Sequence, residues 1–169
     1  MNPEVLARIR AVKRASRILR AGAWRAADAI DRIVLDADDR YRRRIVLTAE
    51  QGAKFLLDLA ETTALHDGDG LALDDGTTIA VVARPEPLVE IAAAEATDMV
   101  ATVARLAWHL GNRHAELQIV GDKLRMRRDH VLEEMLARLG AIVMPIEAPF
   151  EPERGAYDHG HGAERGSRG

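Results

Sequence analysis

The second half of the chain carries the apolar pattern that most restricts its fold. An amphipathic helix is predicted over 97–110, because apolar residues recur there at spacings of four, three and four. These apolar positions are Met99, Val103, Leu106 and Leu110. Gly111 follows at once, and we expect it to adopt the left-handed conformation that ends many helices.

A second helix and four short strands complete this pattern. Asp129 is a natural N-cap residue, and the helix that it starts is expected to end at Gly140. The apolar stripe of this helix is Leu132, Met135, Leu136 and Leu139. Strands are expected at 88–91, 117–119, 124–126 and 141–146, and the turn Gly121-Asp122 joins the middle two. The order β-α-β-β-α-β predicts a ferredoxin-like domain.

The first half is predicted to be rich in β-strands, with one helix. Strand patterns occupy 31–35, 42–47, 71–73 and 77–83, and the last two form a hairpin. Thr48 and Gln51 are spaced as a capping box, which predicts a helix from there to about Glu61. The residues expected on its inner face are Phe55, Leu56 and Leu59.

These patterns divide the chain into four parts. Pro85 and Pro87 interrupt regular structure and indicate a linker over 84–87. The basic N-terminus is expected to be a solvated extension, and the residues from Glu151 onward have little to bury. The parts are an extension (1–16), a β-rich domain (17–85), a ferredoxin-like domain (86–148) and a flexible tail (149–169). The predicted fold class is therefore α+β: an N-terminal β-rich domain followed by a ferredoxin-like βαββαβ domain and a disordered C-terminal tail.

Composition excludes several classes of protein. The formal net charge of −3 gives no electrostatic argument for nucleic acid as the main partner. The chain has no cysteine, which excludes a disulfide framework, and no apolar run reaches the roughly 18 residues that span a membrane. We therefore expect a cytoplasmic protein. Neither a hydrolase motif nor a phosphate-binding loop occurs in the sequence, so nothing points to an enzyme.

Histidines are the candidate ligands for a transition metal, because imidazole suits nickel, copper, zinc and iron. His114 stands in a short turn after the helix 97–110, and His130 stands in the first turn of the next helix. His159 and His161 form a His-x-His pair near the C-terminus. Each of these residues, taken singly, is more often a solvated surface histidine than a ligand. Asp67-Gly68-Asp69-Gly70 lacks the further ligands of a calcium loop, so a turn is expected there.

Several motifs, in their order along the chain, resemble the UreE family of urease accessory proteins, which act as nickel metallochaperones. The resemblance extends from about Arg17 to Tyr157. The motifs that carry it are Leu47-Thr48-Ala49-Glu50-Gln51-Gly52-Ala53, Asp67-Gly68-Asp69-Gly70-Leu71, Trp108-His109-Leu110-Gly111-Asn112-Arg113-His114, Asp129-His130-Val131-Leu132 and Pro149-Phe150-Glu151-Pro152-Glu153-Arg154-Gly155-Ala156-Tyr157.

The resemblance implies a homodimer with Ni(II) as bound cargo, although Zn(II) or Cu(II) would also bind in vitro. The β-rich domain would be similar to a peptide-binding chaperone module, and the ferredoxin-like domain would bind nickel and form the dimer contact. His114 would be the principal ligand, placed near the two-fold axis so that both chains contribute. The tail residues His159 and His161 would complete the site. His130 stands where some relatives carry further ligands, but the neighbouring Arg127 and Arg128 would repel a cation.

By the same resemblance, the recipients of the metal are the urease accessory GTPase (UreG) and, through it, the apo-urease complex. Because the tail has only two histidines, we expect delivery of few ions rather than storage.

Two other classes of function stay open from the residues alone. Ferredoxin-like domains often bind RNA on their sheet, so the chain can be a nucleic-acid or peptide-binding module without a metal role. Against RNA, the sheet residues Leu117, Ile119, Leu124 and Met126 include no aromatic side chain. A small metalloenzyme would need a general base beside His114 and His130, and Glu133 or Glu134 is the candidate by proximity.

Overall fold

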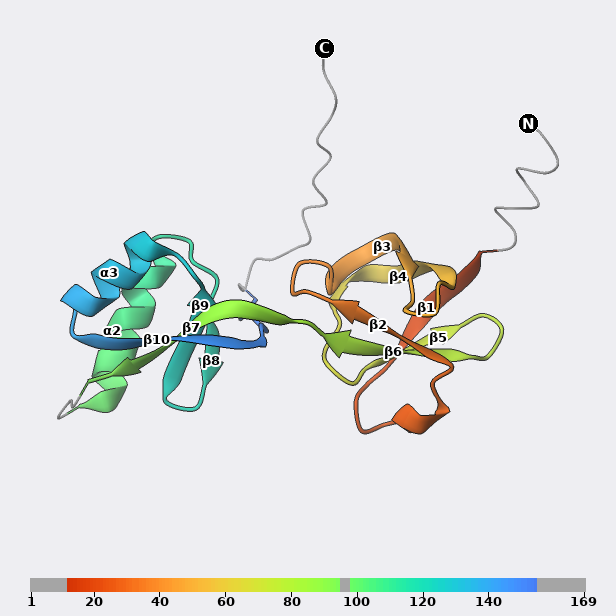
Figure 1. Cartoon of the computed structure of the whole chain (residues 1–169), viewed down its shortest axis with the longest axis horizontal. Coiled ribbons are helices and arrows are strands. Elements are labelled where there is room, and N and C mark those ends of the chain that lie inside the picture. The colour runs from red at the N-terminus through yellow and green to blue at the C-terminus, as the bar shows by residue number, and fades with distance from the viewer. Residues whose placement is uncertain (1–11, 95–97, 155–169) are drawn as a thin grey trace, which may run out of the picture.

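Two β-sheets organise the chain in the computed structural model, which describes residues 12–94 and 98–154. Each sheet has a hydrophobic core of its own, and a third, smaller cluster of Ala37, Leu88 and Phe150 lies where the two parts meet. In Figure 1 the two parts lie side by side, and the strand β7 runs between them.

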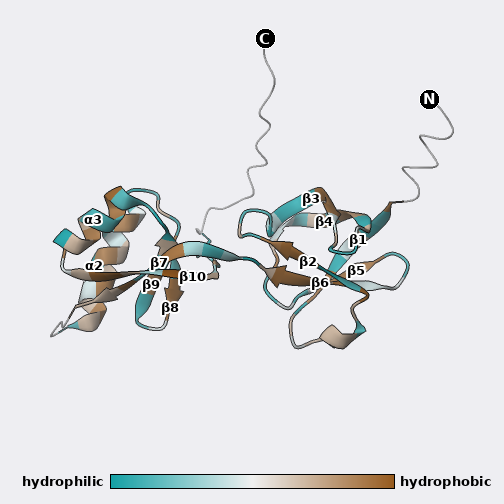
Figure 2. Cartoon of the chain, in the orientation of Figure 1, coloured by the Kyte–Doolittle hydropathy of each residue, from teal (hydrophilic) through white to brown (hydrophobic). Residues whose placement is uncertain are grey.

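The N-terminal part is built on a six-stranded sheet, which confirms the predicted β-rich domain. Its strands are β1 (Lys13–Leu19), β2 (Asp31–Leu35), β3 (Tyr41–Thr48), β4 (Lys54–Ala64), β5 (Gly70–Leu73) and β6 (Thr78–Ala83). They lie in the order β2-β6-β5-β1-β4-β3. A short 3₁₀ helix, η1 (Ala26–Asp28), precedes β2. In Figure 2 the hydrophobic colour is concentrated on β2 and β6 within this sheet.

The helix predicted after Thr48 is wrong, because that segment forms the strand β4. Its core-facing residues are 1%, 0% and 6% exposed and alternate along the strand: Phe55, Leu57 and Leu59. Leu56, which we expected on the inner face, is paired on the opposite face with Val46 of β3. β4 has a strand on each side, β1 and β3, and this pairing decides between helix and strand for an apolar segment whose pattern fits both.

The N-terminal extension predicted for 1–16 is also wrong in its last residues. Lys13–Leu19 forms β1, which lies between β4 and β5 inside the sheet. Ala15 is fully buried, whereas Arg14 and Arg17 on either side are exposed. Ala15 is the one fully buried residue of β1 and stands among charged and polar neighbours, so the strand pattern is too weak to recognise in the sequence. Residues 1–11 lie outside the described part of the chain.

The C-terminal part confirms the predicted ferredoxin-like domain. Its elements are β7 (Pro85–Ala93), α2 (Met99–Gly111), β8 (Gln118–Val120), β9 (Lys123–Arg127), α3 (His130–Arg138) and β10 (Ala141–Pro149). The strands lie in the order β10-β7-β9-β8, and both helices cover one face of the sheet (Figure 1). Asp98 caps α2 through the Ala101 amide, and Asp129 caps α3 as predicted.

The expected linker over 84–87 is instead the beginning of β7. Pro85 and Pro87 pair with Pro149 and Glu147 of β10. The other neighbour, β9, pairs only with Leu88–Ile91. Two prolines are tolerated here because this end of β7 has a neighbour on one side alone. Neither helix of the described residues is long and apolar enough to cross a membrane.

Glu90 links two neighbouring strands of the sheet, β7 and β9, by charge. Its carboxylate accepts hydrogen bonds from Lys123 at 2.7 Å and from Arg125 at 2.9 and 3.1 Å. The bonds from Lys123 and then Arg125 hold the pKa of Glu90 below its usual value. A carboxyl group with a lowered pKa stabilises the folded state above its unfolded pKa, and this stabilisation is lost as the pH falls through the folded pKa.

Glu90→Gln is therefore expected to lower the free energy of unfolding near neutral pH by roughly 1–3 kcal/mol. The difference from wild type should begin to shrink as the pH falls below about 4.5, where the unfolded carboxyl group takes up a proton, and should vanish once the pH has fallen below the lower folded pKa. Denaturant titrations over a pH series measure both effects. Glu134→Gln, at the exposed ion pair with Arg138, is the matched control and should change little. A Glu90→Gln difference that does not depend on pH would contradict this account.

Candidate metal site

His114 has a backbone conformation that is rare for a residue with a side chain. Its φ is 56°, and within the described ranges no other residue except glycine has a positive φ. The residue is exposed and lies between α2 and β8. Our prediction that Gly111 adopts the left-handed conformation is wrong: Gly111 is the last residue of α2, and its φ is not positive.

Two backbone hydrogen bonds hold His114 in this conformation. The His114 amide donates to the Gly111 carbonyl at 3.0 Å, and the Ala115 amide donates to the Leu110 carbonyl at 3.2 Å. Together these bonds form a Schellman motif, the usual left-handed end of a helix, with His114 at the position that glycine normally occupies. Ala115 packs against the core cluster that contains Leu110, so the loop is fixed from inside the domain.

The left-handed conformation costs a residue with a Cβ atom about 1–2 kcal/mol. Glycine would avoid this cost, and the exposed imidazole of His114 adds nothing to the core. A strained residue whose side chain the fold does not need is a reason to look for a role of that side chain. The exposed imidazole of His114 is free of the core and therefore available to bind a ligand.

His130, the second candidate, is exposed at the first position of α3. The segments that carry His114 and His130 border the same hollow of about 180 Å³. Ala115 and Glu116 line it from one segment, and Arg128 and Asp129 line it from the other. The structure therefore brings the two predicted segments to one side of the domain.

The two arginines expected to repel a cation near His130 are both paired with carboxylates. Arg128 donates two hydrogen bonds to Glu133, at 3.1 and 3.2 Å, and this contact raises the pKa of Arg128. Arg127 makes ion pairs with Asp38, Glu86 and Glu116. Pairing cancels much of the positive charge beside His130, so the repulsion is weaker than we predicted from the sequence.

In the described ranges, no three His, Asp or Glu side chains are grouped closely enough to hold a metal ion. His159 and His161 lie outside these ranges. His114 thus contributes one imidazole from a fixed loop, and a site built on it needs ligands from the tail or from another chain. Glu133 and Glu134, the candidate bases of a metalloenzyme, pair with Arg128 and Arg138.

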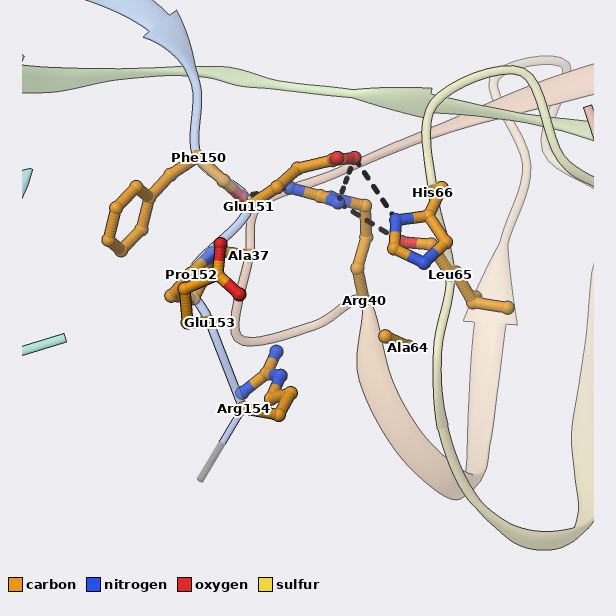
Figure 3. Close-up of a pocket in the computed structure, with 10 residues that line it drawn as sticks. All are labelled: Ala37, Arg40, Ala64, Leu65, His66, Phe150, Glu151, Pro152, Glu153 and Arg154. Atoms are coloured by element: carbon orange, nitrogen blue, oxygen red, sulfur yellow. Dashed lines mark hydrogen bonds and ion pairs between the residues drawn. The ribbon is translucent and has the colours of Figure 1, made fainter. Parts of the chain in front are cut away.

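The first residues of the expected flexible tail are packed at the junction of the two parts. Phe150 is fully buried, and Arg40 of the N-terminal part, 3% exposed, donates to the carbonyls of Phe150 and Leu65. Figure 3 shows Arg40 and His66 directed at the Glu151 carboxylate, at 3.3 and 3.4 Å. These residues line a hollow of about 340 Å³. Arg40 joins segments more than a hundred positions apart, and nothing in the local sequence marks it.

This packing anchors the beginning of the tail beside the His114 loop. The Glu153 amide donates to the carbonyl of Leu117, and the Glu151 amide donates to the side chain of Gln118 at 3.2 Å. The guanidinium of Arg154 lies 3.8 Å from the centre of the Tyr41 ring. Glu153 is therefore fixed at Leu117, which follows His114 by three residues.

The helix that leads to His114 also exposes an apolar face. Val100 is 79% exposed and Trp108 is 64% exposed, and Ala104 lies between them on the same side of α2. Arg105 is the charged residue among the exposed neighbours on this face. A helix that is apolar on its outer as well as its inner side normally packs against something on both sides.

Comparisons with known proteins identify relatives of the whole described chain. A model of the UreE urease accessory protein N-terminal domain matches residues 8–84, and the model of the UreE C-terminal domain matches residues 86–168. Three relatives, each named urease accessory protein UreE, are similar to this chain. The protein of Bradyrhizobium sp. strain ORS 278 is 53% identical to it over 152 residues, and that of Bradyrhizobium sp. strain BTAi1 is 54% identical over 144 residues. The protein of Rhodopseudomonas palustris strain HaA2 is 51% identical over 148 residues. The matches cover 88%, 85% and 88% of this chain, and 70%, 68% and 66% of those relatives.

The strain at His114 makes a prediction that needs no metal. His114→Gly and His114→Ala both remove the imidazole, but only glycine adopts the left-handed conformation at no steric cost. The glycine variant should be more stable than the alanine variant by roughly 0.5–1 kcal/mol, after the larger entropy loss of glycine on folding is counted. Denaturant unfolding of the metal-free proteins measures the difference. An alanine variant at least as stable as the glycine variant would show that the left-handed conformation is not enforced.

Proposed function

Because the chain belongs to the UreE family of urease accessory proteins, we propose that it binds Ni(II) and delivers it for assembly of the urease metallocentre. The observation that carries the proposal is His114, an exposed imidazole on a strained and hydrogen-bonded helix end. Imidazole is a good ligand for nickel, and the rigid backbone spares most of the entropy cost of fixing the ligand.

The proposed site is completed by symmetry. In a homodimer with a two-fold axis near His114, one residue in each chain becomes a pair of imidazoles that face a common ion. The exposed apolar face of α2 supports this arrangement, since Trp108 lies six residues before His114 and would be buried by a second copy of the helix. Dimer formation and metal binding would then use one surface.

The tail histidines supply the remaining ligands in this proposal. Glu153 is bonded to Leu117, which follows His114 by three residues, a span of at most about 10 Å. His159 follows Glu153 by six residues, which can span about 20 Å. The tail is therefore long enough for His159 and His161 to reach an ion at His114 in either chain. His130 is a peripheral ligand at most, on the far side of the hollow that the two segments share.

Release follows from the same chemistry. A site of imidazoles at an exposed interface leaves coordination positions open, so an acceptor can exchange ligands with it. We propose the urease accessory GTPase (UreG) and the apo-urease complex as acceptors in the cytoplasm. Zn(II) and Cu(II) compete at such a site, and copper has the higher intrinsic affinity, so delivery of nickel depends on which metals are available.

Nickel titration by calorimetry, with the oligomer mass recorded, tests the proposal. We expect one tight Ni(II) per dimer, weakened by more than about 100-fold in His114→Ala because the ligand pair is lost. His130→Ala is the matched control and should keep the tight site, whereas a chain ending at Tyr157 should bind more weakly. A tight site that survives His114→Ala would assign the nickel to other residues and overturn the proposal.

The apolar face of α2 is tested separately. Trp108→Glu should convert the dimer to monomers, since it places a charge in the proposed contact. Ile30→Glu, at a residue 48% exposed in the N-terminal part, is the control and should leave the dimer intact. Sedimentation velocity over a range of concentrations measures the mass. A Trp108→Glu protein that is still folded and dimeric would place the contact elsewhere.

A further inference from the structure

One guanidinium connects the loop after His114 to both parts of the chain. Arg127 is the last residue of β9, which lies between β7 and β8 (Figure 1). Each of its three side-chain nitrogen atoms donates to a different carboxylate: Nη1 to Glu116 at 2.8 Å, Nη2 to Asp38 at 2.9 Å and Nε to Glu86 at 3.3 Å. The three carboxylates belong to three segments, which are the loop before β8, the turn before β3 and the beginning of β7.

Arg127 is held in place by contacts that do not involve Glu116. The second oxygen of Glu86 accepts a hydrogen bond from the Ala37 amide at 2.8 Å, so the backbone fixes that carboxylate. The guanidinium carbon of Arg127 lies 5.2 Å from the centre of the Phe150 ring, which is fully buried. Arg127 is therefore a fixed donor, to which the half-exposed side chain of Glu116 is bound.

Glu116 is the carboxylate nearest to His114 along the chain. It follows His114 by two residues, so the two Cα atoms are at most about 7 Å apart. Both side chains are exposed, and a carboxylate released from Arg127 would be within reach of an ion at His114. Carboxylate oxygens suit magnesium, calcium and manganese, whereas imidazole suits nickel, copper and zinc. The bond to Arg127 therefore decides whether an oxygen ligand is available beside the imidazole.

We infer that Arg127 is a positioning residue that keeps Glu116 away from the metal and so makes the His114 site selective for ions that prefer nitrogen ligands. The inference rests on the proposed function and adds to it the residue that sets the selectivity. In the proposed dimer each chain contributes His114, so two carboxylates are withheld. A site that included them would also bind Mn(II), and it would hold Ni(II) more firmly because opposite charges attract.

The test measures Mn(II) binding to the full-length protein through the loss of the electron paramagnetic resonance signal of free Mn(II). Arg127→Gln should bind Mn(II) about tenfold more tightly than wild type, because the released carboxylate becomes a ligand. Damage to the fold would lower the affinity rather than raise it. The gain should disappear when Arg127→Gln is combined with Glu116→Gln or with His114→Ala, since each double variant lacks one of the two ligands. Glu116→Gln alone should bind Mn(II) as wild type does.

Arg113→Gln is the matched control for charge. Arg113 is adjacent to His114, and its side chain donates to the carbonyl of His109 at 2.9 Å rather than to a carboxylate. The substitution removes the same positive charge without releasing a ligand, so the Mn(II) affinity should stay within about twofold of that of wild type at 0.15 M salt. An equal gain in Arg113→Gln would show that net charge sets the affinity, and the inference would be overturned. So would an Arg127→Gln protein with unchanged Mn(II) affinity, or a gain that persists in either double variant.

Titration of Ni(II) by calorimetry separates this inference from the proposed function. Absence of a tight Ni(II) site in wild type, or a tight site that survives His114→Ala, would remove the proposed function and the inference with it. A tight Ni(II) site that requires His114, together with unchanged Mn(II) affinity in Arg127→Gln, would overturn the inference alone. Circular dichroism confirms that each variant is folded.

Discussion

The helix end at His114 is the constraint on which the rest of this account depends. The Leu110–Ala115 and Gly111–His114 hydrogen bonds close a left-handed turn whose usual occupant is glycine, and they place an imidazole there instead. The fold tolerates this strain because Ala115 packs against the core cluster of the domain. A rigid backbone with an exposed imidazole suits the proposed role of holding and then transferring an ion, since neither step would require the domain to rearrange.

The junction of the two parts extends this rigidity to the beginning of the tail. Arg40 is almost completely buried and joins the N-terminal part to the carbonyl of Phe150 and the carboxylate of Glu151. Removing such a residue would leave buried acceptors without donors, so the junction is held as firmly as a core contact. Glu153 is thereby held at Leu117, three residues after His114, and the two histidines that we propose as further ligands follow Glu153 by six and eight residues.

The sequence predicts the ferredoxin-like domain well and the N-terminal sheet less well, for identifiable reasons. The 4-3-4 spacing in α2 and the N-cap at Asp129 are local signals, and both are confirmed. The local sequence of β4 predicts a helix and that of β1 an extension, and both predictions are wrong because these strands form by pairing with strands distant in the sequence. Gly111 is a poor guide to the left-handed residue, since propensity favours glycine there and the structure places His114 in that conformation instead. The metal ligands themselves stay predictions, supported by the place of His114 and by the reach of the tail.

The most direct test of the central claim is a crystal structure of the nickel-loaded protein with anomalous scattering recorded at the nickel absorption edge. The account predicts an anomalous peak between the His114 side chains of two chains related by a two-fold axis, with His114 still in the left-handed conformation. A peak bound within one chain at His130 or His66, with His114 free of metal, would contradict it.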